Sequence, residues 1–268
     1  MVTPEIAPNH GGAAAALRAA EADREPVPPL REWLPAGDQV GAYAVQAYNE
    51  ALRVAAGDRV VGRKIGLTSD VVQRQLGVST PDYGSIYADS CFGDREPVPL
   101  GRFITPRVEA EIAFVLGADL TQDDPTYADI VRATDFVLPV IEIVDSRIVD
   151  WRISIADTIA DNASYGGFVL GGRPTSLRDI DLPDVAMTMR QGDEVVSTGA
   201  GVACLGNPIV AVQWLARALR RESVSLRAGD IVLSGALGPM VPVTSPSTFT
   251  ARFRDLGSVS AVFEGEKA

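Results

Sequence analysis

Histidine is nearly absent from this sequence: His10 is the only one among 268 residues. It lies in the Asn-His-Gly-Gly stretch near the amino terminus, whose composition predicts a flexible segment. A Ser-His-Asp or Cys-His catalytic group would have to recruit this one residue, and so would a histidine-ligated zinc site. We therefore expect chemistry that uses carboxylates, lysine, serine, tyrosine, backbone amides or a hard metal ion.

Cysteine is also scarce. Cys91 and Cys204 lie far apart and in no Cys-x-x-Cys spacing. This pattern excludes a disulfide scaffold and a thiolate zinc site, and it predicts two reduced, partly buried thiols.

The sequence has no excess of basic residues and no long apolar run. Its net charge is −11, whereas a nucleic-acid partner needs a concentrated basic surface. No run approaches the roughly 20 apolar residues of a membrane helix, and no signal peptide is recognisable. We therefore expect a cytoplasmic protein with neither a nucleic-acid nor a membrane partner. An anionic substrate would have to be attracted by local positive groups or by a bound cation.

What is present is a chain rich in strand patterns. Helices are predicted at residues 12–24, 39–56, 70–76, 151–162 and 207–221, and strands at 60–67, 107–116, 137–144, 165–170, 185–190, 194–198, 231–234, 248–254 and 258–264. Asp38 and Asn207 are expected to cap two of the helices. Strands outnumber helices and hairpin signals are frequent, so the pattern predicts a mixed α+β fold. We place an N-terminal helical arm at residues 1–60 and the main domain at residues 61–268.

Three glutamates lie in strands that should be buried. Period-two alternation places Glu109 and Glu111 on one face of a strand, and Glu142 sits inside an apolar run. A buried carboxylate is costly unless it is paired or coordinated. Ion pairs with Arg107 and Arg147 would satisfy these groups, and so would a shared Mg²⁺ or Mn²⁺ ion. The residues alone leave both interpretations open.

Other polar residues also have two interpretations. Lys64, between glycines in an apolar strand, is either a snorkelling lysine or a group that meets an anion or moves a proton. Asp82 lies in a Pro-Asp-Tyr-Gly stretch that is typical of a turn. A third group is either helix capping or part of a site: Asp157, Asp161, Asn162 and Ser164.

Several stretches together resemble one enzyme family. They are residues 61–68, 73–78, 81–84, 106–112, 157–164, 227–233 and 235–240. In this order they resemble the 2-hydroxypentadienoate (2-oxopent-4-enoate) hydratase family, within the fumarylacetoacetate hydrolase superfamily. The resemblance covers nearly the whole chain from about residue 12.

The resemblance implies a mixed, rolled β-sheet core with flanking helices. It also implies Mg²⁺ or Mn²⁺ bound by Glu109, Glu111 and Glu142, with active-site roles for Lys64, Asp82 and Ser164. The implied reaction is hydration of 2-hydroxypenta-2,4-dienoate, or of a C5-substituted homologue, to a 4-hydroxy-2-oxo acid. Such reactions serve the meta-cleavage catabolism of aromatic compounds or steroids. We further expect a homo-oligomer, associated with a decarboxylase or aldolase of the same pathway.

Two alternatives remain beside hydration. The sister 4-oxalocrotonate decarboxylases share the fold and the metal ligands, but they tend to carry Met at the position of Ile65 and a different segment at residues 81–84. An inactive scaffold partner of a sister enzyme would be expected to have lost one of the three glutamates, and all three are present. Both comparisons favour a hydratase.

Overall fold

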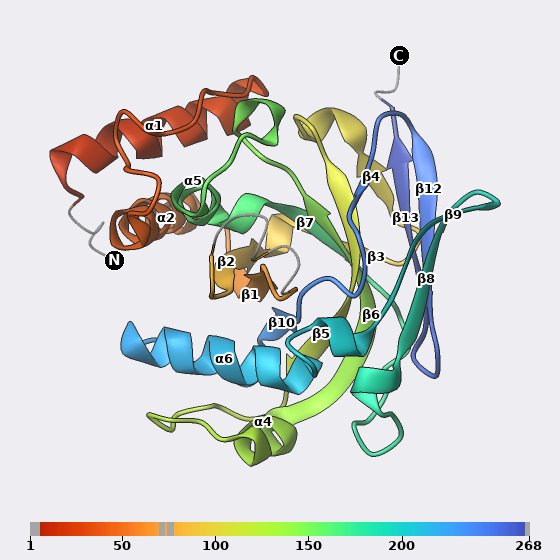
Figure 1. The fold of residues 1–268 in the computed structure, drawn as a ribbon. Coiled ribbons are helices and arrows are strands. Elements are labelled where there is room, and N and C mark those ends of the chain that lie inside the picture. Colours follow the sequence, from red (N-terminus) through yellow and green to blue (C-terminus); the bar gives the residue numbers. More distant parts are fainter. Residues whose placement is uncertain (1–5, 70–72, 74–77, 266–268) are drawn as a thin grey trace.

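The computed structural model describes residues 6–69, 73 and 78–265. Within these ranges two β-sheets pack against each other, and the helices lie mainly on the other side of the larger, curved sheet (Figure 1). The predicted α+β class with a rolled mixed sheet is confirmed. The predicted helix at residues 70–76 lies outside the described residues except for residue 73.

The larger sheet runs through the centre of the molecule. Its strand order is β2-β1-β10-β5-β6-β7-β3, with β11 paired to β5. The strands are β1 (Val60–Gly66), β2 (Asp82–Tyr87), β3 (Cys91–Gly93), β5 (Arg107–Leu116), β6 (Thr134–Val144), β7 (Tyr165–Leu170), β10 (Ile231–Leu233) and β11 (Val241–Pro242). β1 pairs with β10, and β3 with β7, in parallel, whereas the β5–β6 and β6–β7 pairs are antiparallel.

The smaller sheet covers one face of the larger sheet. Its order is β4-β13-β12-β8-β9, and its strands are β4 (Pro97–Pro99), β8 (Ala186–Gln191), β9 (Glu194–Ala200), β12 (Ser247–Phe253) and β13 (Gly257–Glu264). The predicted β8–β9 and β12–β13 hairpins are both formed. Gly192 stands in the β8–β9 turn at φ 58°, a conformation that favours glycine.

Alternation along β5 decides which side chains enter the core. Val108, Ala110, Ile112 and Phe114 are buried in the cluster that includes residues of the smaller sheet. Because neighbouring side chains on a strand point to opposite faces, Glu109 and Glu111 must lie on the other face. These two glutamates therefore lie on the side of the larger sheet that faces the helices.

Three helices cover this face from the amino-terminal side (Figure 1): α1 (Pro8–Asp23), α2 (Gln39–Ala55) and α5 (Ile155–Ala160). They share a core that contains Leu17, Val45 and Ile159. As predicted, the Asp38 side chain caps α2, accepting a hydrogen bond from Gly41 N at 2.9 Å. The division into an arm (1–60) and a catalytic domain (61–268) stays a prediction.

Helix α6 (Pro208–Arg221) begins where its sequence predicts. The Asn207 side chain accepts a hydrogen bond from Ile209 N at 2.9 Å, and Pro208 occupies the first turn. Among the described residues, one helical stretch, Gly201–Arg221, is long and apolar enough to cross a membrane. It consists of α6 and the turn before it. Its apolar face is buried against the protein core and α4 (Tyr127–Ala133) packs beside it, which is the arrangement of a core helix.

The helix predicted at residues 151–162 is wrong in extent. Only α5 (Ile155–Ala160) is α-helical, because left-handed residues interrupt the chain on both sides. Asp150 and Trp151 precede it at φ 55°, and Asn162 and Ala163 follow it at φ 53° and 52°. Both interruptions lie next to the active-site residues that the sequence predicts, Lys64 and Asp82.

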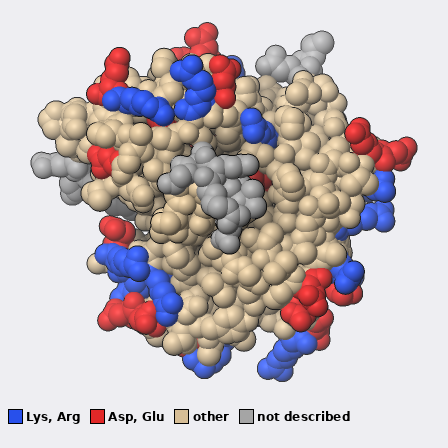
Figure 2. Space-filling view, viewed as in Figure 1, with Lys and Arg blue, Asp and Glu red and all other residues tan. Residues whose placement is uncertain are grey.

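Charged side chains on the face shown in Figure 2 are scattered around its rim, with acidic residues beside basic ones. Among the described residues this face shows no extended basic patch. The mixed charges on this face agree with the acidic net charge of the chain.

Candidate metal centre and active site

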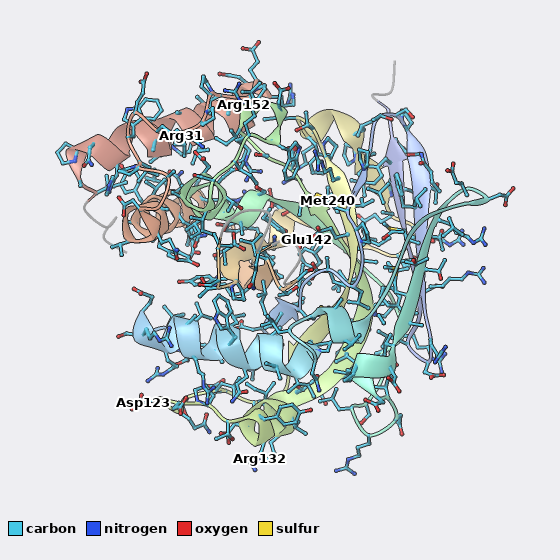
Figure 3. All side chains as sticks on the ribbon, in the orientation of Figure 1. Arg31, Asp123, Arg132, Glu142, Arg152 and Met240 are labelled. Atoms are coloured by element: carbon cyan, nitrogen blue, oxygen red, sulfur yellow. The ribbon has the colours of Figure 1, made fainter. Side chains whose placement is uncertain are left out.

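Three glutamates meet at the centre of the larger sheet. Glu109 on β5 stands directly opposite Glu142 on β6, and Glu111 follows two residues along β5. Carboxylate oxygens of the three lie within 4.8 Å of one another. Figure 3 labels Glu142 in the middle of the fold, between the helices and the smaller sheet. The strand register therefore assembles the cluster without help from any loop.

This cluster is unfavourable as three bare anions. Glu111 and Glu142 are fully buried, and Glu111 Oε1 and Glu142 Oε2 have no hydrogen-bond partner among the residues that the structure describes. Burial and the neighbouring Glu142 carboxylate raise the pKa of Glu109 to about 7. The same two causes raise the pKa of Glu111 well above its ordinary value. Protons or a cation must therefore neutralise part of this charge.

Lys64 supplies one positive charge at the cluster. Its Nζ lies 3.1 Å from Glu142 Oε1 and donates a hydrogen bond to Ala163 O at 2.8 Å. Burial acts to lower the pKa of Lys64, but the carboxylate of Glu142 and those around it outweigh burial and raise the pKa above its ordinary value. Lys64 is only 3% exposed, so the snorkelling interpretation is wrong.

The arginine ion pairs considered from the sequence are also wrong. Arg147 pairs with Asp161 and donates to Tyr165 O at 2.8 Å. Arg107 stacks on the Trp151 ring, with its Cζ 4.4 Å from the ring centroid. Within the described residues, neither guanidinium lies within 4 Å of a cluster carboxylate. One lysine thus faces three glutamates.

Asp82 lies next to Lys64 rather than in an exposed turn. It is the first residue of β2, paired with Gly66, and is 1% exposed. Its Oδ2 accepts a hydrogen bond from Thr158 Oγ1 at 3.3 Å, while Oδ1 has no partner. Burial raises the pKa of Asp82, and Lys64 acts in the opposite direction. Burial therefore favours the protonated form of this carboxyl, whereas Lys64 favours the carboxylate.

Ser164 is brought to the site by a left-handed turn. Asn162, Ala163 and Ser164 have φ values of 53°, 52° and 54°, which cost roughly 1–2 kcal/mol each for residues other than glycine. The Asn162 side chain holds the turn, accepting from Ser85 N at 2.7 Å and donating to Ser85 O at 2.8 Å. The turn presents Ala163 O to Lys64 and leaves the buried Ser164 Oγ without a partner.

The other polar residues of this segment are structural. Asp157 caps α5 in a reciprocal arrangement with Ser154, and it also accepts from Leu30 N at 2.8 Å. Asp161 is engaged by Arg147. Of the four polar residues grouped in the sequence, only Ser164 faces the site.

A cavity of about 500 Å³ opens from the cluster. Lys64, Asp82, Glu109 and Ser164 line its polar end. Other lining residues were not predicted from the sequence, among them Thr158, Trp151, Ile153, Leu237 and Met240. Met240 follows the apolar Leu237–Pro239 stretch, and Trp151 was placed in a helix, so neither carried a signal for a site.

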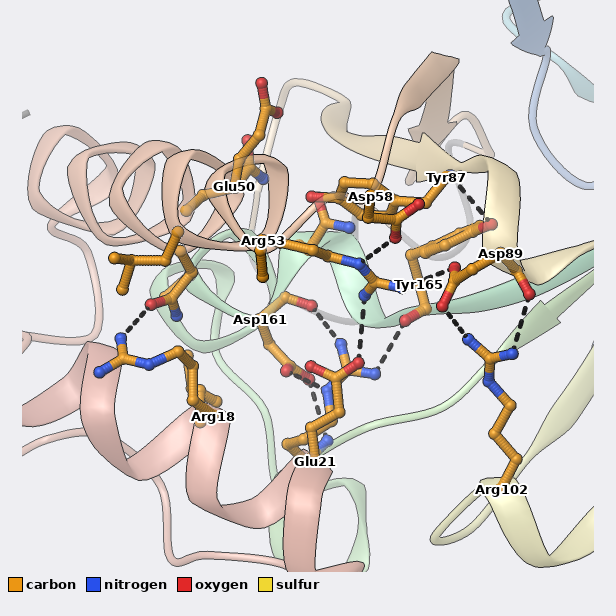
Figure 4. A pocket seen from close by; sticks show the side chains of 18 residues that line it. Arg18, Glu21, Glu50, Arg53, Asp58, Tyr87, Asp89, Arg102, Asp161 and Tyr165 are labelled. Atoms are coloured by element: carbon orange, nitrogen blue, oxygen red, sulfur yellow. Dashed lines mark hydrogen bonds and ion pairs between the residues drawn. The ribbon is translucent and has the colours of Figure 1, made fainter. Parts of the chain in front are cut away.

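A second cavity, of about 480 Å³, lies between the amino-terminal helices and the larger sheet (Figure 4). Its charges are already paired. Arg53 contacts Asp58, Asp89 and Glu21, and Arg102 contacts Asp89. These ion pairs connect α1 and α2 to segments beside the larger sheet, so the residues of this cavity have a structural role.

The donor set of the first cavity fits a hard divalent cation. Its ligands are carboxylate oxygens, two of them buried and without hydrogen-bond partners, and oxygen is the ligand that Mg²⁺, Mn²⁺ and Ca²⁺ prefer. The partly exposed Glu109 leaves room on the cavity side for water or substrate.

Comparison with known proteins finds relatives over nearly the whole chain. Residues 54–264 match the family model described as Fumarylacetoacetate (FAA) hydrolase C-terminal. "2-keto-4-pentenoate hydratase 2" of Dechloromonas aromatica (strain RCB) is 58% identical over 251 residues, 94% of this chain and 96% of that protein. "2-keto-4-pentenoate hydratase" of Paraburkholderia phymatum is 55% identical over 93% of this chain and 95% of that protein.

A solved structure has the same fold throughout. The 4-oxalocrotonate decarboxylase from Pseudomonas putida G7, complexed with magnesium and adipate, superposes with a TM-score of 0.92. It is 33% identical and covers 98% of this chain and 100% of that one. The fold and the carboxylate cluster define a divalent-metal enzyme that acts on a small molecule. Within that class, the chain belongs to the fumarylacetoacetate hydrolase family.

Proposed function

We propose that this protein is a metal-dependent hydratase. It adds water to 2-hydroxypenta-2,4-dienoate, or to a C5-substituted homologue, and forms a 4-hydroxy-2-oxo acid in the meta-cleavage catabolism of aromatic compounds or steroids. The observation that carries this proposal is the meeting of three glutamates with Lys64 and Asp82 at the polar end of one cavity. The 58% identity to a 2-keto-4-pentenoate hydratase supports it.

Glu109, Glu111 and Glu142 are the proposed ligands of Mg²⁺ or Mn²⁺. When bound, such an ion supplies a Lewis acid for the C1 carboxylate and the C2 oxygen of the substrate. Lys64 adds a fixed positive charge beside Glu142, because its raised pKa keeps the ammonium protonated at neutral pH. An acidic protein can thereby attract an anionic substrate locally.

Asp82 is the proposed proton carrier. Its raised pKa and its Oδ1, which has no partner among the described residues, allow it to deliver a proton to C5 while the proton of the C2 hydroxyl passes to solvent water, which gives an α,β-unsaturated ketone. The resulting Asp82 carboxylate can then take a proton from water as the hydroxyl bonds to C4, which returns Asp82 to its protonated form. Solvent returns one proton to C3, so the net change is the addition of one water molecule.

Ser164 is proposed to orient that water or the substrate. Its Oγ is buried, has no protein partner and lines the cavity. A hydroxyl can both donate and accept, so it can hold a water molecule toward Asp82.

The test is turnover of 2-hydroxypenta-2,4-dienoate by the purified protein. We expect loss of the dienol absorbance and a product heavier by one water, both abolished by EDTA and restored by Mg²⁺ or Mn²⁺. Glu111→Gln should lose metal affinity and activity together, whereas the exposed Glu194→Gln on β9 is the matched control. Full, metal-independent turnover by Glu111→Gln would contradict the ligand assignment.

The decarboxylase alternative is favoured by one observation, the TM-score of 0.92 to the 4-oxalocrotonate decarboxylase. It is tested by supplying 4-oxalocrotonate and measuring CO₂ release beside hydration. Release of CO₂ faster than hydration of the dienoate would replace the proposed reaction. If neither activity appears and neither Mg²⁺ nor oxalate raises the melting temperature, the scaffold alternative takes its place.

We also infer a cytoplasmic homo-oligomer that associates with a pathway decarboxylase or aldolase. The mass of the purified protein by light scattering, alone and mixed with such an enzyme, tests the oligomer and the association.

A further inference from the structure

The cavity has lining residues on both sides of the glutamate cluster. Beside Glu111, whose Oε2 accepts a hydrogen bond from Gly235 N at 2.8 Å, the lining consists of small residues such as Thr68, Ala203 and Ala236. On the other side, Arg107 lies two residues from Glu109 on the same strand face, roughly 6.6 Å along β5. Trp151 and Met240, which both contact Arg107, line the cavity there.

Trp151 forms a fixed wall at this far end. Arg107 stacks on its ring at 4.4 Å, and Trp151 Nε1 donates to Thr105 O and Oγ1 at 3.2 and 3.1 Å. Its backbone and that of Asp150 are held at φ 55°, in the left-handed region. A side chain whose backbone and ring are both restrained keeps one position. A residue that selects between substrates has to be fixed in this way.

The far end is apolar although an arginine is close by. Ile153, Leu237 and Met240 line it together with Trp151. Trp151 and Met240, which line the cavity, both contact the Arg107 guanidinium, through the indole ring and the thioether sulfur. A carboxylate placed here would lose its hydration against carbon and sulfur atoms.

We propose that Trp151, positioned by Arg107, determines which substituent the far end of the substrate carries. It accepts hydrogen or a short alkyl group at C5 and disfavours a carboxylate. This inference rests on the proposed function and on a substrate that is bound by its C1 and C2 oxygens at the glutamates and extends along the cavity toward Trp151. This selectivity distinguishes the protein's substrates from dienols that carry a second carboxylate.

The proposal is tested by binding, without turnover. With Mg²⁺ present, calorimetry compares 2-oxohexanoate with 2-oxoadipate, two saturated acids that differ in a terminal methyl or carboxylate. We expect wild type to bind 2-oxohexanoate at least about tenfold more tightly, the scale on which apolar pockets discriminate. Trp151→Leu should reduce this ratio several-fold, and Trp151→Phe should reduce it less because the ring is retained.

Two further variants separate specificity from folding. Trp33→Leu changes a tryptophan that packs among the amino-terminal helices, and it should leave the ratio unchanged. Arg107→Leu should lower the ratio by freeing the Trp151 ring, whereas Arg107→Lys should restore part of it.

Three results would overturn the proposal. They are a wild-type preference for 2-oxoadipate, an unchanged ratio in Trp151→Leu with an intact melting transition, and no binding of either acid by wild type. Selective binding without hydratase turnover would instead reject the proposed function and leave the specificity assignment standing.

Discussion

Glu109 on β5 and Glu142 on β6 are register partners, so two carboxylates face each other across neighbouring strands. Like charges directly opposite one another destabilise a sheet, and burial makes their repulsion stronger. Lys64 is positioned to neutralise one of them. The remaining charge explains why the fold should depend on a cation at this position.

Metal binding should stabilise the protein measurably. At a free metal concentration of 100 times its dissociation constant, the stabilisation is about 2.7 kcal/mol, or roughly 5–10 °C in melting temperature. Thermal melts of the EDTA-treated protein with and without Mg²⁺ measure the shift. Glu142→Gln should lose most of it and Glu194→Gln none. An equal shift in both variants would place the metal elsewhere.

The metal-free protein should become less stable as pH rises from about 5 to 8. The pKa of Glu109 is about 7 in the folded state against an ordinary value of 4.5, so the folded state binds more protons than the unfolded state between these values. Stability contributed by that proton is present below pH 4.5 and is lost as pH passes 7. Melting temperatures in EDTA at pH 5.5 and 7.5 measure the slope.

Two controls define the origin of this slope. Glu109→Gln should flatten it in part, with the remainder due to other buried carboxyls whose pKa burial raises, among them Glu111, Asp82 and Asp161, the last to about 7. Saturating Mg²⁺ should weaken or reverse the slope, because the metal competes with the proton for Glu109. A slope of the same size in wild type and Glu109→Gln would show that Glu109 does not titrate in this range.

Removing the lysine charge should reduce turnover more than stability. Lys64→Met keeps the approximate length of the side chain but leaves Glu142 and Asp82 without their cation, and we expect kcat to fall by about 10²–10⁴. Steady-state kinetics at saturating Mg²⁺ measure this effect. Lys64→Arg should recover only a small part, since Nζ lies between Glu142 and Ala163 O in a buried space. Wild-type kcat in Lys64→Met would remove the lysine from the mechanism.

The sequence predicted the strands that carry Lys64 and the three glutamates, but it placed Asp82, the first residue of β2, in a turn. The β5 boundaries agree with the prediction to the residue, because a β-branched and apolar run with period-two glutamates permits few other interpretations. The residues alone could not decide between ion pairs and a metal. That choice depends on Lys64 and Glu142 meeting across 78 positions, which only the sheet register fixes.

Long-range contacts also explain what was missed. Trp151 was placed in a helix because local propensity does not reveal a left-handed backbone held by Thr105 and Arg107. The turn that presents Ser164 depends likewise on Asn162 meeting Ser85, 77 residues away. Strained segments that tertiary contacts hold are where sequence patterns are expected to fail.

Gly66 should be essential to the position of Asp82. A Cβ added at Gly66 would lie 2.1 Å from Asp82 Oδ1, so Gly66→Ala must displace this carboxylate from its place beside Lys64. We expect kcat to fall by about 10²-fold or more, the scale of losing a proton carrier. The melting shift induced by Mg²⁺ should remain, because Gly66 lies on β1 and not on the strands of the glutamates.

Gly172 provides the matched control for this substitution. A Cβ at Gly172 would meet nothing within 4 Å, so Gly172→Ala should leave both kcat and the Mg²⁺-induced melting shift unchanged. Wild-type turnover by Gly66→Ala would show that Asp82 Oδ1 is not needed where the structure holds it. Loss of activity in both variants would trace the effect to general sensitivity to added methyl groups, and the role of Asp82 as proton carrier would lose its support.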